Sequence, residues 1–295
     1  MKKFFLLLSI TIVSCQPKDD PQLMKDVNEI FAKQKGIFAV AFKNLQTGET
    51  LFIHEHEIFH AASTMKTPVM IEVFNQVHQG KFALNDSLIL KNEFKSIVDS
   101  SAFALSSADD SEQELYKHLG SKRTVDQLVY DMIISSSNLA TNMIIELVDA
   151  KEVTETLKSL GIYNTKVLRG VEDSKAYEKG MNNVTTAYDL MVLFEGIAQR
   201  QFITAAFCER MENILLDQKF NEIIPALLPA DVKVAHKTGN ITGVRHDSGI
   251  VILPDGNKYV LVLLSKELED EDAGINAMAE VSRKIYEHVA AESHN

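Results

Sequence analysis

Tryptophan is absent from this chain of 295 residues, and cysteine, glycine and proline are scarce, with 2, 13 and 6 residues. So little glycine and proline excludes a collagen-like or low-complexity chain. Basic residues are also outnumbered, 30 against 41 acidic ones, so the net charge is −11 and no nucleic-acid partner is expected. What the chain does contain is 45% hydrophobic residues, enough for a folded domain with a sizeable buried core.

The N-terminus carries a short apolar run. Lys2 and Lys3 precede the almost wholly apolar residues 4–13, a run too short to cross a bilayer but typical of a secretory signal peptide. Cys15 follows in the segment IVSC, which resembles the lipobox of bacterial lipoproteins, where the cysteine becomes the lipidated first residue of the mature chain. The alternative is an ordinary signal peptide followed by a chance cysteine.

These signals predict a signal peptide (1–14), a lipidated Cys15 with a polar tether (15–22) and a domain (23–295). Cleavage before Cys15 removes two lysines and no acids, which takes the net charge from −11 to −13. Cys208 then has no cysteine to pair with inside the chain, so the core must stabilise the domain. We expect an exported protein, lipid-anchored to a bacterial membrane, with its domain facing the periplasm or the cell exterior.

Hydrophobic periodicity predicts strands near both ends of the domain and helices between them. Strands are expected at 38–45, 50–54, 232–238, 248–253 and 258–265. A helix over 62–80 would begin with Ser63 or Thr64 as its N-cap and end at Gly80. Further helices are expected at 124–135, 138–150, 153–160, 186–199, 205–216 and 273–291, and residues 96–114 are expected to form a loop.

This order of elements predicts an α+β fold, a three-layer α/β/α sandwich whose antiparallel sheet is built from both termini. The α/β part would comprise about 23–61 and 217–295. An all-helical region, about 62–216, would be inserted between them.

Ser63-Thr64-Met65-Lys66 is the S-x-x-K of the chain. Residues three apart share a helical face, so the Lys66 ammonium can reach the Ser63 hydroxyl. A serine needs a neighbour to take its proton before it becomes a good nucleophile, and a partly desolvated lysine can do so. The alternative is a helix-capping serine followed by a solvated lysine.

Two further tripeptides follow in the chain. Ser136-Ser137-Asn138 lies at a predicted helical junction, and Lys237-Thr238-Gly239 lies on a predicted strand. With Ser63 and Lys66 they make the sequence resemble the penicillin-recognising serine hydrolases, in particular the class A β-lactamases. The resemblance extends from about Phe38 to the C-terminal helix and implies a β-lactamase/transpeptidase-like fold.

The resemblance implies a role for each motif residue. Ser63 would be the acylated nucleophile, Lys66 its proton acceptor, and Ser136 the donor of a proton to the leaving nitrogen. The substrate would be bound by Asn138, Lys237, Thr238 and Gly239, and the backbone N–H groups of Ser63 and Asn240 would form the oxyanion hole.

The sequence departs from the family at several positions. Ser137 stands where the family usually has Asp. Glu172, in the segment RGVE, would be the carboxylate that activates water. Because Ala176 replaces the usual asparagine, Asp173 and Glu178 are alternatives for this role. Glu172 could instead have a purely structural role, as the ion-pair partner of Arg169. Ser248 stands where many relatives have an arginine, and Arg245 would replace that side chain in substrate binding.

His56 to His60 (HEIFH) fits the H-E-x-x-H pattern of zinc proteases. That chemistry needs both histidines on one helical face and a third ligand, whereas this segment lies between a predicted strand and the next helix. We therefore favour a polar cluster at a strand end and expect no metal and no cofactor.

The leading hypothesis is a class A-type β-lactamase acting through a Ser63 acyl-enzyme. The first alternative is a DD-peptidase-like cell-wall acyl hydrolase. The second is a β-lactam-sensing lipoprotein that acylates without turnover. The expected partners are a small-molecule β-lactam or peptidoglycan-like substrate and, through the N-terminal lipid, a membrane; the protein is expected to be monomeric.

Overall fold

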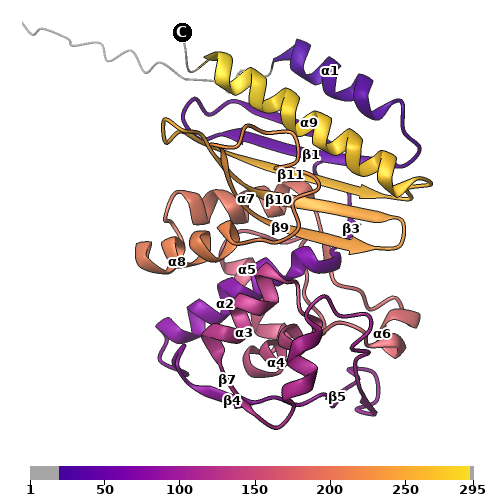
Figure 1. The fold of residues 1–295 in the computed structure, drawn as a ribbon, viewed down its shortest axis with the longest axis vertical. Coiled ribbons are helices and arrows are strands. Elements are labelled where there is room, and N and C mark those ends of the chain that lie inside the picture. The colour runs from indigo at the N-terminus through magenta and orange to yellow at the C-terminus, as the bar shows by residue number, and fades with distance from the viewer. Residues whose placement is uncertain (1–19, 293–295) are drawn as a thin grey trace, which may run out of the picture.

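The computed structural model describes residues 20–292, which form an α+β fold (Figure 1). The fold class predicted from the sequence is confirmed. Cys15, the signal peptide and most of the expected tether lie outside the described residues. Within residues 20–292, no helix combines the length and the apolar character needed to cross a membrane.

A single five-stranded antiparallel sheet, in the order β2-β1-β11-β10-β9, is built from both ends of the domain. Strand β1 pairs with β11 over its whole length, with Ile37 opposite Lys266 and Asn44 opposite Tyr259. This pairing joins the N-terminal hairpin to the C-terminal strands. The strands are β1 (Ile37–Asn44), β2 (Thr50–Ile53), β9 (Lys233–Ile241), β10 (Val244–Ile252) and β11 (Lys258–Lys266).

Both faces of the sheet are apolar because side chains alternate along each strand. In β1, Ala39 and Ala41 face one side, and Val40 and Phe42 face the other. The first side packs against α7 (Ala187–Ala198) and α8 (Ala205–Leu216), and the second is covered by α1 (Pro21–Phe31) and α9 (Glu271–Glu292) (Figure 1). The expected three layers are therefore present.

The helical part surrounds α2 (Lys66–His78), of which ten residues are buried. A buried helix has little freedom to move, so Lys66 at its start is held on a rigid base. The other elements of this part are α3 (Val125–Ile134), α4 (Asn138–Val148), α5 (Ala150–Ser159), α6 (Ser174–Glu178), η1 (Ala62–Met65), η2 (Gln113–His118), β3 (Phe59–His60), β4 (Ser87–Ile89), β5 (Phe94–Lys95), β6 (Ala102–Phe103), β7 (Lys122–Thr124) and β8 (Val184–Thr185).

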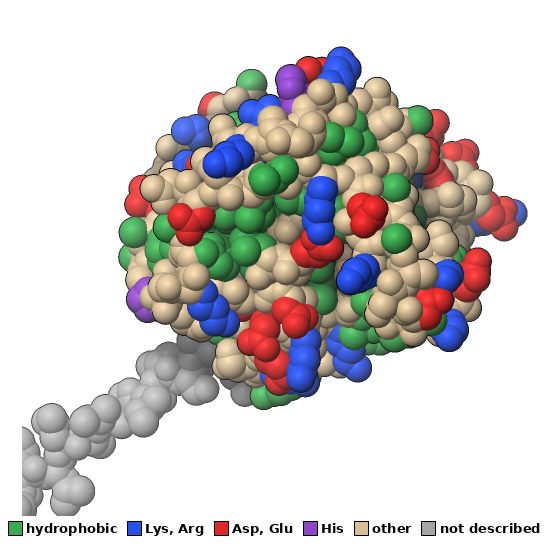
Figure 2. All heavy atoms as spheres, turned by 90° about the horizontal axis from the view of Figure 1, so that it is seen from below, with side chains coloured by type: hydrophobic (Ala, Val, Ile, Leu, Met, Phe, Trp, Pro, Cys, Tyr) green, Lys and Arg blue, Asp and Glu red, His purple; other side chains and the backbone are tan. Residues whose placement is uncertain are grey.

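Figure 2 shows this part of the molecule from below. Acidic and basic side chains lie intermixed with apolar ones over this face, so the acidic excess of the chain does not gather into one patch there. Exposed ion pairs such as Lys117 with Glu114 are screened by solvent and contribute little to stability.

Three details differ from the sequence prediction. Pro21 and Gln22, assigned to the tether, form the first turn of α1, because Asp20 accepts hydrogen bonds from the backbone N–H groups of Gln22 and Leu23. Helices α7 and α8 pack on the sheet, although they lie inside the range assigned to the helical region. Finally, α2 has no side-chain N-cap, since the 3-10 turn η1 leads directly into it.

Candidate active site

A cleft with two lobes lies where η1 meets strand β9. The lobes have volumes of about 440 and 420 Å³, and both are lined by Ser63, Asn138 and Asn240. Most side chains expected at the site therefore lie together. Ser136, Thr238, Gly239 and Arg245 line the first lobe, and Glu172 and Glu178 line the second.

Lys66 is fully buried beneath the cleft. Its Nζ donates hydrogen bonds to the Ser136 carbonyl oxygen at 2.7 Å, to Asn138 Oδ1 at 3.0 Å and to Ser136 Oγ at 3.2 Å. Ser63 lies three residues earlier, in η1, where its hydroxyl caps no helix and lines the cleft. The alternative of a capping serine followed by a solvated lysine is wrong.

Burial lowers the pKa of the Lys66 ammonium to about 7, because desolvation penalises the charged form. The negative charges of Asp110 and Glu172 oppose this effect and raise the pKa of Lys66. Near neutral pH a substantial fraction of Lys66 is therefore an uncharged amine, which can accept a proton from a hydroxyl.

A pH dependence follows from the state of Lys66. We expect the rate of covalent reaction at Ser63 to rise with pH through about 7 and then to level off, because only the neutral amine can take the proton. Below the pKa the rate should fall about tenfold per pH unit. Intact-mass kinetics between pH 5 and 9 would measure this, and a flat profile would contradict it.

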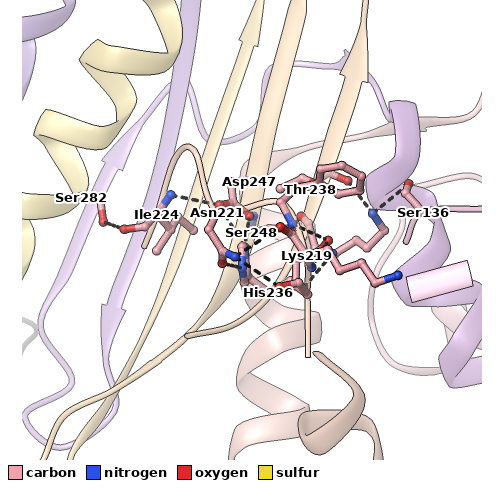
Figure 3. Close-up of polar contacts among 12 residues, drawn as sticks. Ser136, Lys219, Asn221, Ile224, His236, Thr238, Asp247, Ser248 and Ser282 are labelled. Carbon is pink, nitrogen blue, oxygen red and sulfur yellow. Dashed lines mark hydrogen bonds and ion pairs between the residues drawn. The ribbon is translucent and has the colours of Figure 1, made fainter. Parts of the chain in front are cut away.

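Ser136 joins Lys66 to a second buried lysine. Lys237 Nζ donates to Ser136 Oγ at 3.1 Å and to the Thr238 carbonyl oxygen at 2.9 Å (Figure 3). Burial and the nearby Lys66 charge lower the pKa of Lys237 well below its usual value. Ser136 has φ +55°, a left-handed conformation that costs ~1–3 kcal/mol. Its hydroxyl is held between two amines and can relay protons.

Asp247 is the buried carboxylate behind Lys237, and its charge raises the pKa of that lysine. It accepts hydrogen bonds from the backbone N–H groups of Ile224 and Ser248, both at 3.0 Å, and lies 2.8 Å from His236 Nδ1 (Figure 3). Sequence analysis missed this group, although His236 directly precedes the Lys237-Thr238-Gly239 motif. A buried charge nearby offsets part of the cost of burying Lys237.

Arg245 and Ser248 lie on the same strand, β10, in different surroundings. The Ser248 hydroxyl is fully buried and donates to the Lys237 carbonyl oxygen at 3.3 Å. Arg245 lines the first lobe, where its guanidinium donates to Asn240 Oδ1 and to a carboxylate oxygen of Glu271. Arg245 is therefore the side chain of this pair that can meet a ligand.

Glu172 contacts the motif residues directly. Its Oε1 accepts a hydrogen bond from Asn138 Nδ2 at 2.8 Å, so the Asn138 amide links Glu172 to Lys66. Arg169 instead donates to the carbonyl oxygens of Met181 and Gly170 at 2.9 and 3.0 Å. Within residues 20–292, no ion pair joins Arg169 to Glu172. The carboxylate is thus available to the second lobe.

The loop that carries Glu172 is held by Asn142, which sequence analysis also missed. Its side-chain amide accepts from Val171 N at 2.7 Å and donates to the Val171 carbonyl oxygen at 3.0 Å. A Cβ on Gly170 would lie 2.3 Å from Asn142 Oδ1, so a larger residue there would displace the Asn142 side chain. Asn142 lies four residues after Asn138 and so on the same face of α4, a spacing that could have revealed it.

The two alternative carboxylates differ in their surroundings. Asp173 is buried and accepts from Ser96 Oγ and Ile97 N, both at 2.9 Å, and from Ala176 N at 3.1 Å. Asp173 therefore holds the loop through these hydrogen bonds. Glu178 is exposed at the edge of the second lobe.

The HEIFH segment forms no helix. His56 packs against Tyr188, Glu57 pairs with Lys266, and His60 Nδ1 accepts from Ala62 N at 3.0 Å. These three side chains therefore have separate partners. Across residues 20–292 no group of three His, Cys, Asp or Glu side chains is placed to hold a metal ion.

Fold and cleft together define a serine hydrolase of the penicillin-recognising class. The chain belongs to the β-lactamase enzyme family, whose sequence profile matches residues 22–289.

Individual relatives agree with this assignment over nearly the whole chain. The chain is 25% identical to the extended-spectrum β-lactamase PER-1 of Pseudomonas aeruginosa, over 95% of this chain and 92% of PER-1. The solved structure of PBP-A superposes with a TM-score of 0.79 at 26% identity, covering 93% of this chain and 98% of PBP-A. A β-lactamase from Sphaerobacter thermophilus gives 0.77 at 26% identity, with 91% and 97% covered.

Proposed function

We propose that the protein is a class A-type β-lactamase that hydrolyses the amide bond of β-lactams through an acyl-enzyme on Ser63. The observation that carries the proposal is the placement of Lys66. It is a buried amine with a pKa lowered to about 7, three residues from a cleft-lining serine, and one amide group, that of Asn138, connects it to Glu172.

In the proposed acylation, neutral Lys66 takes the Ser63 proton as Ser63 Oγ attacks the carbonyl carbon. The backbone N–H groups of Ser63 and Asn240 stabilise the oxyanion. The ring C–N bond then breaks, and Ser136, which lies within hydrogen-bond distance of Lys66, passes a proton to the leaving nitrogen. Lys237 and Thr238 hold the substrate carboxylate.

In the proposed deacylation, Glu172 takes a proton from water as the water oxygen attacks the ester carbon. The Ser63 oxygen leaves as the alcohol and regains a proton, so the enzyme returns to its starting state. Asn138 binds the amide of the substrate side chain, and Arg245 supports the carboxylate from the first lobe.

The test is to mix purified protein with a chromogenic cephalosporin and to follow turnover and intact mass together. Many turnovers per molecule support the proposal. A single burst with a lasting adduct on Ser63 would favour a binder or peptidase, and no adduct would refute the acyl-enzyme mechanism.

A DD-peptidase-like acyl hydrolase is the second candidate. Ser137 and Ala176 favour it, because both depart from the class A pattern. A variant of PBP-A has been solved as an acyl-enzyme complex with penicillin G. The burst experiment separates the two candidates, since this one predicts acylation without efficient release.

For the location of the protein we propose export and a lipid anchor on Cys15, from the sequence pattern of the first 15 residues. A Cys15→Ala variant is then expected to leave the membrane fraction of the producing cells and to lack the mass of the lipid. An unchanged distribution and mass would refute the anchor.

A further inference from the structure

Asp110 lies in the loop between β6 and η2, outside the motifs that contain Ser63, Ser136 and Lys237. Its neighbours Asp109 and Ser111 line the first lobe of the cleft, whereas Asp110 itself is 3% exposed. The chain thus places a carboxylate directly behind the cleft wall.

Four neutral donors hold this carboxylate. Its Oδ2 accepts from the backbone N–H of Leu139 at 2.8 Å, from the Tyr116 hydroxyl at 2.9 Å and from Ser137 Oγ at 3.4 Å. Its Oδ1 accepts from the backbone N–H of Glu112 at 3.0 Å. No basic side chain is among these four donors.

These bonds fall at the start of α4, where the motif residues lie. Ser137 is the N-cap of the helix, and its Oγ also accepts from Ala140 N. Leu139 N–H is one of the free donors of the first turn, and a negative charge is favourable there. Asp110 therefore holds the Ser137 side chain and the Asn138–Leu139 peptide, on either side of Asn138, from a segment distant in sequence.

We propose that Asp110 is a positioning residue that supplies, from outside the motif, the carboxylate that Ser137 lacks, and so holds Ser136 and Asn138 against Lys66. This inference rests on the proposed function, because its effect is on acylation at Ser63. It also explains how the chain retains both flanking motif residues with a serine between them.

The charge of Asp110 provides a signature that packing alone would not give. The charged groups facing Lys66 are Asp110, Glu172 and Lys237, with Asp247 behind Lys237. Asp110 raises the pKa of Lys66, so its neutralisation should lower that pKa further. The acid limb of the acylation profile should then move to lower pH, even if the plateau rate falls.

The experiment compares Asp110→Asn, Ser137→Asp and the double variant with the wild type. In Asp110→Asn we expect the plateau acylation rate to fall ~10–100-fold, because a displaced reacting group loses about that much. The double variant returns a carboxylate to the N-cap, where aspartate is as good as serine, and should recover most of the rate. Ser137→Asp alone should lower the melting temperature, since it sets two buried carboxylates 3–4 Å apart, roughly the present Ser137–Asp110 separation.

Asp255→Asn is the matched control, because Asp255 also accepts a backbone N–H but lies exposed in the turn between β10 and β11. Tyr116→Phe removes a single bond to Asp110 and provides a milder variant if Asp110→Asn folds poorly; it should slow acylation less and leave the acid limb in place.

The outcomes are distinct. Slower acylation with a shifted acid limb, and recovery in the double variant, support the inference. If the wild type acylates and Asp110→Asn matches it in rate and pH profile, Asp110 has no positioning role, while the proposed function stands. If the double variant is no better than Asp110→Asn, the carboxylate does not act through position 137. If the wild type forms no adduct, the proposed function fails and this inference falls with it.

Discussion

Glu172→Gln is expected to acylate on Ser63 and then to stop, so that steady-state turnover of a chromogenic cephalosporin falls ~10²–10⁴-fold. Glutamine keeps the shape of the side chain, and its amide oxygen can still accept the Asn138 hydrogen bond. It cannot take a proton from water. Acylation uses Lys66 instead, so the first half of the reaction should persist.

Intact mass after rapid quenching measures the fraction of protein that carries the adduct. We expect all of the protein to be acylated within one turnover and the adduct to decay slowly. Glu178→Gln is the matched comparison, because Glu178 lines the same lobe but is exposed. A trapped adduct in Glu178→Gln with normal turnover in Glu172→Gln would transfer the role to Glu178. Unchanged turnover in both would contradict water activation by a carboxylate of this lobe.

Ser63→Ala has the second large expected effect, complete loss of the covalent adduct and a ~10³–10⁶-fold loss of turnover. The structure also predicts what should not change. Because the Ser63 hydroxyl caps no helix, its removal should leave the melting temperature nearly unaltered, whereas the loss of a capping serine costs ~1 kcal/mol.

Ser159→Ala is the control for Ser63→Ala, since it removes an exposed hydroxyl at the end of α5 that bonds only the nearby Thr156 carbonyl oxygen. It should acylate and turn over normally. An adduct that persists in Ser63→Ala would place the nucleophile elsewhere, and peptide mapping of that adduct would identify it.

Much of the fold follows from local patterns. The apolar residues at 38–45 predict a strand, which the structure has at 37–44, and helical spacing locates α8 at the observed residues 205–216. Helix α1 was missed because its short apolar face, Leu23, Val27 and Phe31, follows a polar segment and becomes meaningful only against the sheet and α9.

The residues of the site likewise fall into those that the sequence predicts and those that only the structure reveals. Spacing within a helix ties Ser63 to Lys66, and motif order adds Ser136, Asn138 and Lys237. No local pattern indicates Asp110 or Asp247, since their roles depend on segments that meet only in the folded chain.

The sequence by itself determined the family, and it predicted the nucleophile and the two lysines of the site, because these groups lie in short motifs of recognisable chemistry. Only the tertiary structure decided the state of those groups. Burial lowers the pKa of Lys66 to about 7, and the carboxylates of Asp110 and Glu172 set how far it falls. Desolvation and Coulomb interactions depend on distances through space, and folding alone creates those distances.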